Sequence, residues 1–262
     1  MSSMMMEFPN LRKCFIPDPG YVLFDIDQEG ADARVVAWEA NDVALMDAFD
    51  SGINVHTMNA KDAFPELTAI ELEKHNGNLK SSYLYDRIKR AVHLTNYGGT
   101  AGTLAEKCSF SLGEAEDFQA LWLYQLHPNI LDWHERTEYD LQTKGRTVNA
   151  FGDVIDWFDR YSTELWRQAL AWLPQSTVAA VAQEAQIICG RKLEHTQFLL
   201  QVHDSLLFQV QKRHVSAELR RMKEILDNII VPYPRPMVMP WGIKYSEKSW
   251  GDCTKGGWED FF

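Results

Sequence analysis

The chain has 262 residues, enough for one or two domains and a sizeable core. Hydrophobic residues make up 45% and charged residues 24%, as in ordinary globular proteins, which excludes a disordered, collagenous or rod-like chain. The 37 acidic and 26 basic residues give a formal net charge of −11. Such a chain is poorly suited to general polyanion binding, so any contact with nucleic acid depends on local basic patches or bound cations.

The sequence lacks the features of a membrane or secreted protein. It has no run of about 18 apolar residues that could span a bilayer, and its first residues have no apolar segment typical of a secretory signal. The four cysteines are widely spaced without a C-x-x-C pair, which predicts a reducing compartment, incidental thiols and no zinc site.

Apolar periodicity predicts strands in the first and last quarters of the chain and helices between them. In the first half we expect a strand over 21–27, one helix from 31 toward 48, a mostly helical stretch over 53–150, a basic helix over 84–97, a capping box at 111–114, a helix over 129–144 and a short extended piece over 146–153. In the second half we expect a helix over 164–193 with a kink or break at Pro174, a hairpin of 197–202 and 206–210, a helix over 215–229, a strand over 237–245 and a tail from Trp250. This order suggests one sheet built from both ends of the chain, with an inserted helical lobe.

Two aspartates follow apolar strands in this pattern. Asp27 ends the first strand and Asp204 lies at the hairpin tip, so both side chains are expected at one rim of the sheet. Two carboxylates brought together repel unless a cation lies between them, and Mg²⁺ favours one or two carboxylates plus substrate phosphates. The alternative is a pair of unrelated surface aspartates at turns, where Asp is common.

A basic helix offers a second set of candidates. Lys89, His93 and Tyr97 are spaced four apart and share one helical face, where they could hold a triphosphate, a sugar and a base. Arg87 and Arg90 lie close by in the sequence. The alternative is a solvated basic face, and His56 and His203 are on their own equally well explained as capping, core or turn residues.

Taken in order, these blocks resemble the motifs of the family A (DNA polymerase I-like) DNA polymerases. Residues 27–34, DQEGADAR, are similar to the first palm motif, with its Asp at 27 and its Arg at 34. Lys89, His93, Tyr97 and Gly98 match the spacing of the fingers helix motif, and residues 199–204, LLQVHD, resemble the second palm motif. The resemblance runs from about residue 10 to residue 250, and the residues chosen at the motif positions resemble those of viral or phage members of the family.

The resemblance implies an α+β fold in which a small antiparallel palm sheet carries inserted helical fingers. It implies palm segments at 1–57 and 158–262, fingers at 58–157, and template-directed DNA synthesis with two Mg²⁺ ions, for which Mn²⁺ can substitute. The implied catalytic and metal-binding residues are Asp27, Asp204 and the backbone carbonyl of Gln28. The implied nucleotide-binding residues are His56, Arg87, Lys89, His93, Tyr97 and Asp32, the last as the sugar gate, and the implied DNA-binding residues are Arg34, Arg167, Gln175 and His203.

Some positions depart from the family pattern. Asp32 and Ser205 stand where the family usually has Glu, so ribose exclusion is less certain from the sequence. Only about 26 residues precede Asp27, which leaves no room there for the family's thumb and exonuclease domains. We expect a fragment, a separate chain that supplies them, or a protein that works without a thumb. The expected partners are primer–template DNA and dNTP, without a membrane, in the cytoplasm, or the host cytoplasm if the protein is viral.

Two other functions stay open. A non-catalytic DNA-binding polymerase subunit would explain a missing thumb. Asp25-Ile26-Asp27 also fits the D-x-D pattern of nucleotide-sugar glycosyltransferases, although that class does not need the second carboxylate or the Lys-His-Tyr helix.

Overall fold

The structure, a computed structural model, describes residues 10–58 and 83–262. The chain forms two compact units, which we call the sheet unit (residues 1–31 and 178–262) and the helical unit (residues 32–177). The expected palm and fingers boundaries stay a prediction, and the part of the expected helical stretch at 59–82 lies outside the described residues.

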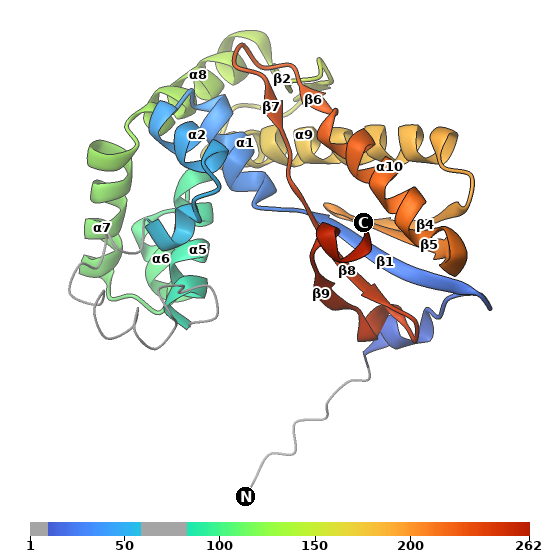
Figure 1. The fold of residues 1–262 in the computed structure, drawn as a ribbon. Helices are drawn as coiled ribbons and strands as arrows, with labels where there is room; N and C mark the ends of the chain where they lie inside the picture. The colour runs from blue at the N-terminus through green and yellow to red at the C-terminus, as the bar shows by residue number, and fades with distance from the viewer. Residues whose placement is uncertain (1–9, 59–82) are drawn as a thin grey trace, which may run out of the picture. The chain divides into compact units, whose positions relative to one another are not determined.

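The strands of the main sheet come from the two ends of the chain, blue and orange to red in Figure 1, and the green middle of the chain is mostly helical. The helices are α1 (Ala31–Glu39), α2 (Val43–Asp50), α5 (Tyr83–Asn96), α6 (Ala101–Cys108), α7 (Leu112–Ala120), α8 (Asn129–Lys144), α9 (Thr163–Lys192) and α10 (Val215–Asp227). The strands are β1 (Tyr21–Gln28), β2 (Arg146–Val148), β3 (Val154–Asp156), β4 (Thr196–Val202), β5 (Ser205–Gln211), β6 (Ile230–Val231), β7 (Met237–Val238), β8 (Trp241–Ser246) and β9 (Thr254–Gly256).

The main sheet is built from both ends of the chain, as expected. Its strand order is β4-β5-β1-β8-β9, and each neighbouring pair is antiparallel. The C-terminal segment, expected only as a tail, contributes the edge strand β9. The N-terminal strand β1 therefore lies between β5 and β8, in the interior of the sheet, where both of its edges are hydrogen-bonded.

The two faces of β1 differ in character because successive side chains point to opposite sides. Phe24 and Ile26 are fully buried on one face, and Phe24 is paired with Phe208 and Tyr245. The other face carries Leu23, Asp25 and Asp27, with Leu23 packed in a cluster that includes Leu207 and Trp250. The buried apolar side chains of the amphipathic helix α10, shown alongside the sheet in Figure 1, are Leu219, Met222, Ile225 and Leu226.

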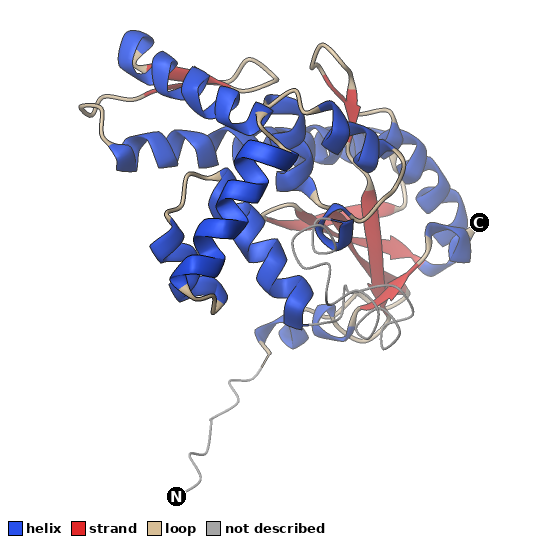
Figure 2. Ribbon diagram, turned by 90° about the vertical axis from the view of Figure 1, so that its left-hand side faces the viewer, coloured by secondary structure: helices blue, strands red, loops and turns tan. Residues whose placement is uncertain are grey.

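The helical unit has its own core. Its fully buried large side chains include Ile88, Leu104, Trp122, Ile130 and Trp133, which come from successive helices of the unit. Figure 2, coloured by secondary structure, shows that more of the described chain is helix, in blue, than strand, in red. Within residues 10–58 and 83–262, no helix is long and apolar enough to cross a membrane.

The expected single helix over 31–48 is wrong, because the chain forms α1 and α2 with a break between them. Asn41 adopts a left-handed conformation with φ of +52°, and the Asp42 amide bonds the Ala37 carbonyl, a geometry that ends helices. Asp42 then caps α2 by accepting a hydrogen bond from the Leu45 amide at 2.9 Å. The apolar periodicity continues through the break, which is why the pattern concealed it.

Three other expectations need correction. The extended piece at 146–153 is the first strand of a hairpin whose second strand is β3. The break considered at Pro174 does not occur, since α9 runs through this residue, whereas a kink there stays a prediction. Leu170, Leu173 and Val181 of this helix are buried, and their packing can offset the backbone bond that proline cannot make. The strand expected over 237–245 is two strands, because Pro240, which cannot donate to a ladder, separates β7 from β8.

Candidate functional site

The end of β1 and the β4–β5 turn bring Asp27 and Asp204 to neighbouring positions. Asp27 is the cross-strand partner of Ser205, the residue directly after Asp204. The Gln28 amide donates to the Asp204 carbonyl at 3.2 Å, which ties the turn to the end of β1. Both aspartates therefore lie at the rim of the main sheet, as expected, and both side chains are partly exposed.

The β4–β5 turn is as short as a hairpin turn can be. Val202 pairs with Ser205, so His203 and Asp204 alone make the connection. His203 is exposed and has φ of +54°, a left-handed conformation that costs a non-glycine residue about 1–2 kcal/mol. Because the turn has only two residues, it sets the alignment of β5 against β4, and this alignment begins with the pairing of Val202 and Ser205.

Asp27 faces a cation that belongs to the protein. The Lys244 Nζ atom lies 3.2 Å from Asp27 Oδ1, and the two side chains are 39% and 33% exposed. Gly242, the partner of Asp27 on β8, leaves room beside this carboxylate, since a Cβ atom there would lie 3.3 Å from Asp27 Oδ1 and 2.9 Å from Glu29 Oε1. The Asp27 carboxylate is thus open to a positive charge on a solvent-accessible side.

These groups suit a hard divalent cation. Two carboxylates, Asp27 and Asp204, and the Gln28 backbone carbonyl are oxygen donors of the kind that Mg²⁺ prefers. The Lys244 ammonium already demonstrates that a cation is accommodated at Asp27. Among the described residues no group of three or more His, Cys, Asp or Glu side chains could hold a metal ion.

A further carboxylate lies behind Asp27 on the same face of β1. Asp25 is only 4% exposed, and it accepts hydrogen bonds from Ser205 Oγ and, at 2.8 Å, from Trp250 Nε1. Burial, together with the Asp25 charge, raises the pKa of the Cys253 thiol to about 12. Sequence reasoning did not assign Asp25 to the site, although its spacing of two residues from Asp27 on a strand was the available signal.

In the helical unit, the face of α5 carries the expected row of side chains. Lys89 is exposed, whereas His93 and Tyr97 are half-buried, with their ring centroids 6.2 Å apart. His56 joins this row, at 5.7 Å from His93 and 5.8 Å from Tyr85. The structure therefore groups His56, His93 and Tyr97, as the motif positions suggested.

The charges near this row set its protonation. Burial lowers the pKa of His93, an effect that the Lys89 ammonium reinforces and the Asp32 carboxylate opposes. Burial and Asp32 both raise the pKa of Tyr97. At neutral pH the row therefore presents a neutral imidazole, a protonated phenol and one exposed ammonium.

The arginines of α5 are largely engaged in holding α6. Arg87 donates to the carbonyls of Cys108 and Ser109, each at 2.8 Å, and Arg90 donates to the Lys107 carbonyl at 3.3 Å. These carbonyls end α6, where a positive charge is favourable. Lys89 and Arg90 are both exposed, and Lys89 belongs to the row that includes His93 and Tyr97.

The residues expected to contact DNA differ in availability. Arg34 is 8% exposed and donates to the Phe49 carbonyl at the end of α2, with Asp50 3.6 Å away. Arg167 donates to the Gly98 carbonyl at 3.0 Å and keeps part of its surface exposed. Gln175 and His203 are exposed, in the helical unit and the sheet unit respectively.

Comparison with known proteins gives a consistent result. A family model described as DNA polymerase family A matches residues 4–247. DNA polymerase I of Rhizobium leguminosarum is 26% identical over 85% of this chain and 22% of its own length, and thermostable DNA polymerase I of Thermus aquaticus is 25% identical over 89% and 28%. The DNA polymerase of Mycobacterium phage D29 is 24% identical over 92% of this chain and 37% of the phage protein.

A solved structure shows the same fold. The POL domain of Pol1 from M. smegmatis, in complex with DNA primer-template and dNTP, superposes with a TM-score of 0.75 at 23% identity, covering 91% of this chain and 42% of that chain. This likeness agrees with the expected α+β palm and fingers fold. The chain spans about a quarter of the length of the bacterial relatives it matches.

Proposed function

This chain belongs to DNA polymerase family A, and we propose that it carries the part of the enzyme that joins a dNTP to a primer 3′-hydroxyl under the direction of a template. The observation that carries the proposal is the clamped pair of carboxylates, Asp27 at the end of β1 and Asp204 in the two-residue turn beside it. The M. smegmatis domain of the same fold was solved with primer-template and dNTP bound, which supports the same substrates here.

The sheet unit would hold the cations. Asp27, Asp204 and the Gln28 carbonyl would bind two Mg²⁺ ions, or Mn²⁺ in their place, which would lower the pKa of the primer 3′-hydroxyl and neutralise charge on the departing pyrophosphate. A cation held by Asp27 would compete with the Lys244 ammonium for this carboxylate, because the two positive charges repel each other. His203, exposed next to Asp204, would contact the duplex near the primer end.

The helical unit would bind the nucleotide. Lys89 would meet the triphosphate, as an exposed point charge on the face of α5. Neutral His93 would pack on the sugar and base, Tyr97 would stack near the template base, and Asp32 would limit space at the sugar. Arg87 and His56 would support the phosphates, with Arg87 acting partly through its hold on α6.

The DNA contacts would come from Arg34, Arg167, Gln175 and His203. With a formal net charge of −11, residues 1–262 attract DNA weakly as a whole. We therefore propose that further basic contacts, from a thumb or from a separate chain, strengthen the grip on primer–template. The glycosyltransferase alternative has no support from the family match. A non-catalytic subunit would share this fold, so the primer-extension assay has to distinguish it from an active enzyme.

The test is primer extension by the purified chain, with Mg²⁺ and with EDTA, alongside Asp27→Asn. Extension that needs Mg²⁺ and is lost in Asp27→Asn is the expected result. Asp18→Asn is the matched control, because Asp18 is a carboxylate hydrogen-bonded to Gln209 of β5 near the opposite end of β1. A chain that binds primer–template but extends nothing under any condition would instead identify a non-catalytic subunit.

A further inference from the structure

Asp25 is a buried carboxylate to which the proposed reaction assigns no role. It is a carboxylate buried on the face of the sheet that also carries Asp27, beside Leu23, Leu207 and Trp250. Burying a carboxylate is unfavourable unless hydrogen bonds compensate, and an apolar residue among such neighbours would be less costly. We propose that Asp25 is a positioning residue, which holds Ser205 and thereby keeps Asp204 beside Asp27 for cation binding.

The geometry of the strands supports this role. Ser205 lies directly opposite Asp27 and directly after Asp204. Its hydroxyl donates diagonally to Asp25 Oδ1, two residues back along β1. The turn that carries Asp204 is thus tied to β1 twice, by this side-chain bond and by the bond from the Gln28 amide to the Asp204 carbonyl.

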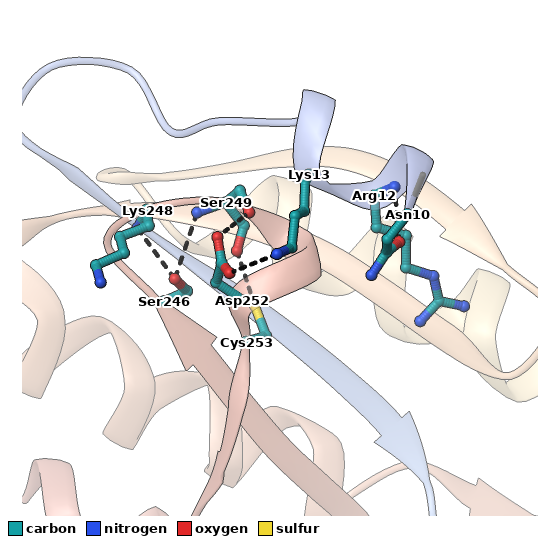
Figure 3. Close-up of polar contacts among 8 residues, drawn as sticks. All are labelled: Asn10, Arg12, Lys13, Ser246, Lys248, Ser249, Asp252 and Cys253. Carbon is teal, nitrogen blue, oxygen red and sulfur yellow. Dashed lines mark hydrogen bonds and ion pairs between the residues drawn. The ribbon is translucent and has the colours of Figure 1, made fainter. Parts of the chain in front are cut away.

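The other oxygen of Asp25 is held by Trp250, which is itself firmly placed. The Trp250 amide donates to the Phe15 carbonyl at 2.8 Å, and Arg12 lies 4.5 Å above its ring. Figure 3 shows the contacts that order the surrounding segment, where Asp252 meets Lys13 at 3.7 Å and accepts from Ser249 at 2.5 Å. Asp25 is therefore fixed on one side and can fix Ser205 on the other.

The inference rests on the proposed function, since it assigns Asp25 a role in binding the cations of that site. The probe is Mn²⁺ alone, added to the full chain without DNA or nucleotide, with bound and free ion separated by electron paramagnetic resonance. We expect Asp25→Asn and Ser205→Ala each to weaken Mn²⁺ binding about tenfold, as loss of an outer partner does at other metal sites. Ser205→Thr keeps the hydroxyl and should restore binding to within about twofold.

The role of Asp25 is tested by comparing the double variant with the single variants, and the two single variants with each other. In a double-mutant cycle, Asp25→Asn with Ser205→Ala should be no weaker than either single variant if Asp25 acts through Ser205. Full additivity, or a loss in Asp25→Asn that Ser205→Ala does not share, would show that the charge of Asp25 acts on the cation directly and would overturn the positioning role.

The controls separate this inference from the proposed function. Asp27→Asn should abolish Mn²⁺ binding and Asp18→Asn should leave it unchanged. If Asp27→Asn loses binding while Asp25→Asn and Ser205→Ala bind normally, only the role of Asp25 is refuted. If Asp27→Asn binds as well as the unaltered chain, the metal site itself is refuted. Should Asp25→Asn unfold by circular dichroism, the Ser205→Ala and Ser205→Thr pair decides alone.

Discussion

The sheet unit and the helical unit carry opposite kinds of candidate residue, although both units have a negative net charge. The sheet unit has 13 basic and 15 acidic residues, a formal net charge of −2, yet its candidates are carboxylates. The helical unit has 13 basic and 22 acidic residues, a formal net charge of −9, yet its leading nucleotide candidate is the cation Lys89. The candidate residues in each unit are therefore defined by the positions of a few charges and not by the overall charge of the unit.

The two units also hold their candidates by different means. In the sheet unit, strand register and a two-residue turn set Asp27 and Asp204, through backbone bonds between distant segments. In the helical unit, the four-residue spacing of one helix sets Lys89, His93 and Tyr97. The first arrangement depends on pairing between segments far apart in the chain, and the second depends on local helix geometry.

The largest effect is expected in the sheet unit. Asp204→Asn should lower kcat for nucleotide addition about a thousandfold or more, because one carboxylate cannot hold two cations against their mutual repulsion. Thermal unfolding should shift little, since the side chain is at a rim and not in the core. Single-turnover extension measures the loss, and near-normal rates in a folded Asp204→Asn chain would remove the carboxylate pair from the reaction.

A large effect on the free energy of unfolding is expected at Gly98, the residue that directly follows Tyr97. Gly98 has φ of +71°, and a Cβ atom would lie 2.5 Å from the Trp166 ring. Gly98→Ala should destabilise the chain by about 2–4 kcal/mol, from strain and overpacking together.

The matched control for Gly98 is Gly113→Ala on α7, where a Cβ atom would meet nothing within 4 Å. This change should be neutral or stabilise the chain by up to about 1 kcal/mol. Chemical denaturation of both variants compares them, and equal stabilities would mean that Trp166 does not pack against Gly98 as described.

A smaller effect separates two cations on α5. Lys89→Ala should raise the KM for dNTP about tenfold with little change in stability, because its side chain is exposed. Arg87→Ala should mainly lower stability, by about 1 kcal/mol, because two carbonyl groups at the end of α6 lose their donors. Steady-state kinetics and thermal unfolding on both variants test the contrast; the reverse pattern would assign phosphate binding to Arg87.

The smallest effect is expected from pH. Burial lowers the folded-state pKa of His134 and of His93, so the unfolded chain takes up protons first as pH falls. Stability is therefore complete above about pH 6.5 and declines as pH falls below that value. Thermal unfolding at pH 7.5 and 5.5 should show a smaller decline for His134→Gln than for the unaltered chain, and an identical decline would exclude His134 as a cause.

Much of this arrangement follows from local sequence. The alternation in residues 21–28 and the turn at His203 and Asp204 predict β1 and the hairpin, and spacing alone predicts the α5 row. These features depend on periods of two and about four residues, which a sequence displays directly.

The features that sequence could not predict depend on distant partners. The burial of Asp25 requires Trp250, which is 225 positions away in the chain. The engagement of Arg87 requires the end of α6, about 20 residues further on, so a motif match to a phosphate-binding helix could not distinguish Arg87 from Lys89. The break at Asn41 likewise leaves the apolar period intact, and only the backbone reveals it.

The two-residue turn between β4 and β5 also determines how this protein can be engineered. One residue inserted between His203 and Asp204 would either lengthen the loop or move β5 by one position, and the second outcome would exchange its two faces. Leu206, Phe208 and Val210 would then exchange faces with Leu207 and Gln209, and the packing on both faces would be lost. Affinity tags, fluorophore-bearing loops and new chain ends are therefore better placed elsewhere, and natural relatives with an altered length at this turn are expected to have lost their function.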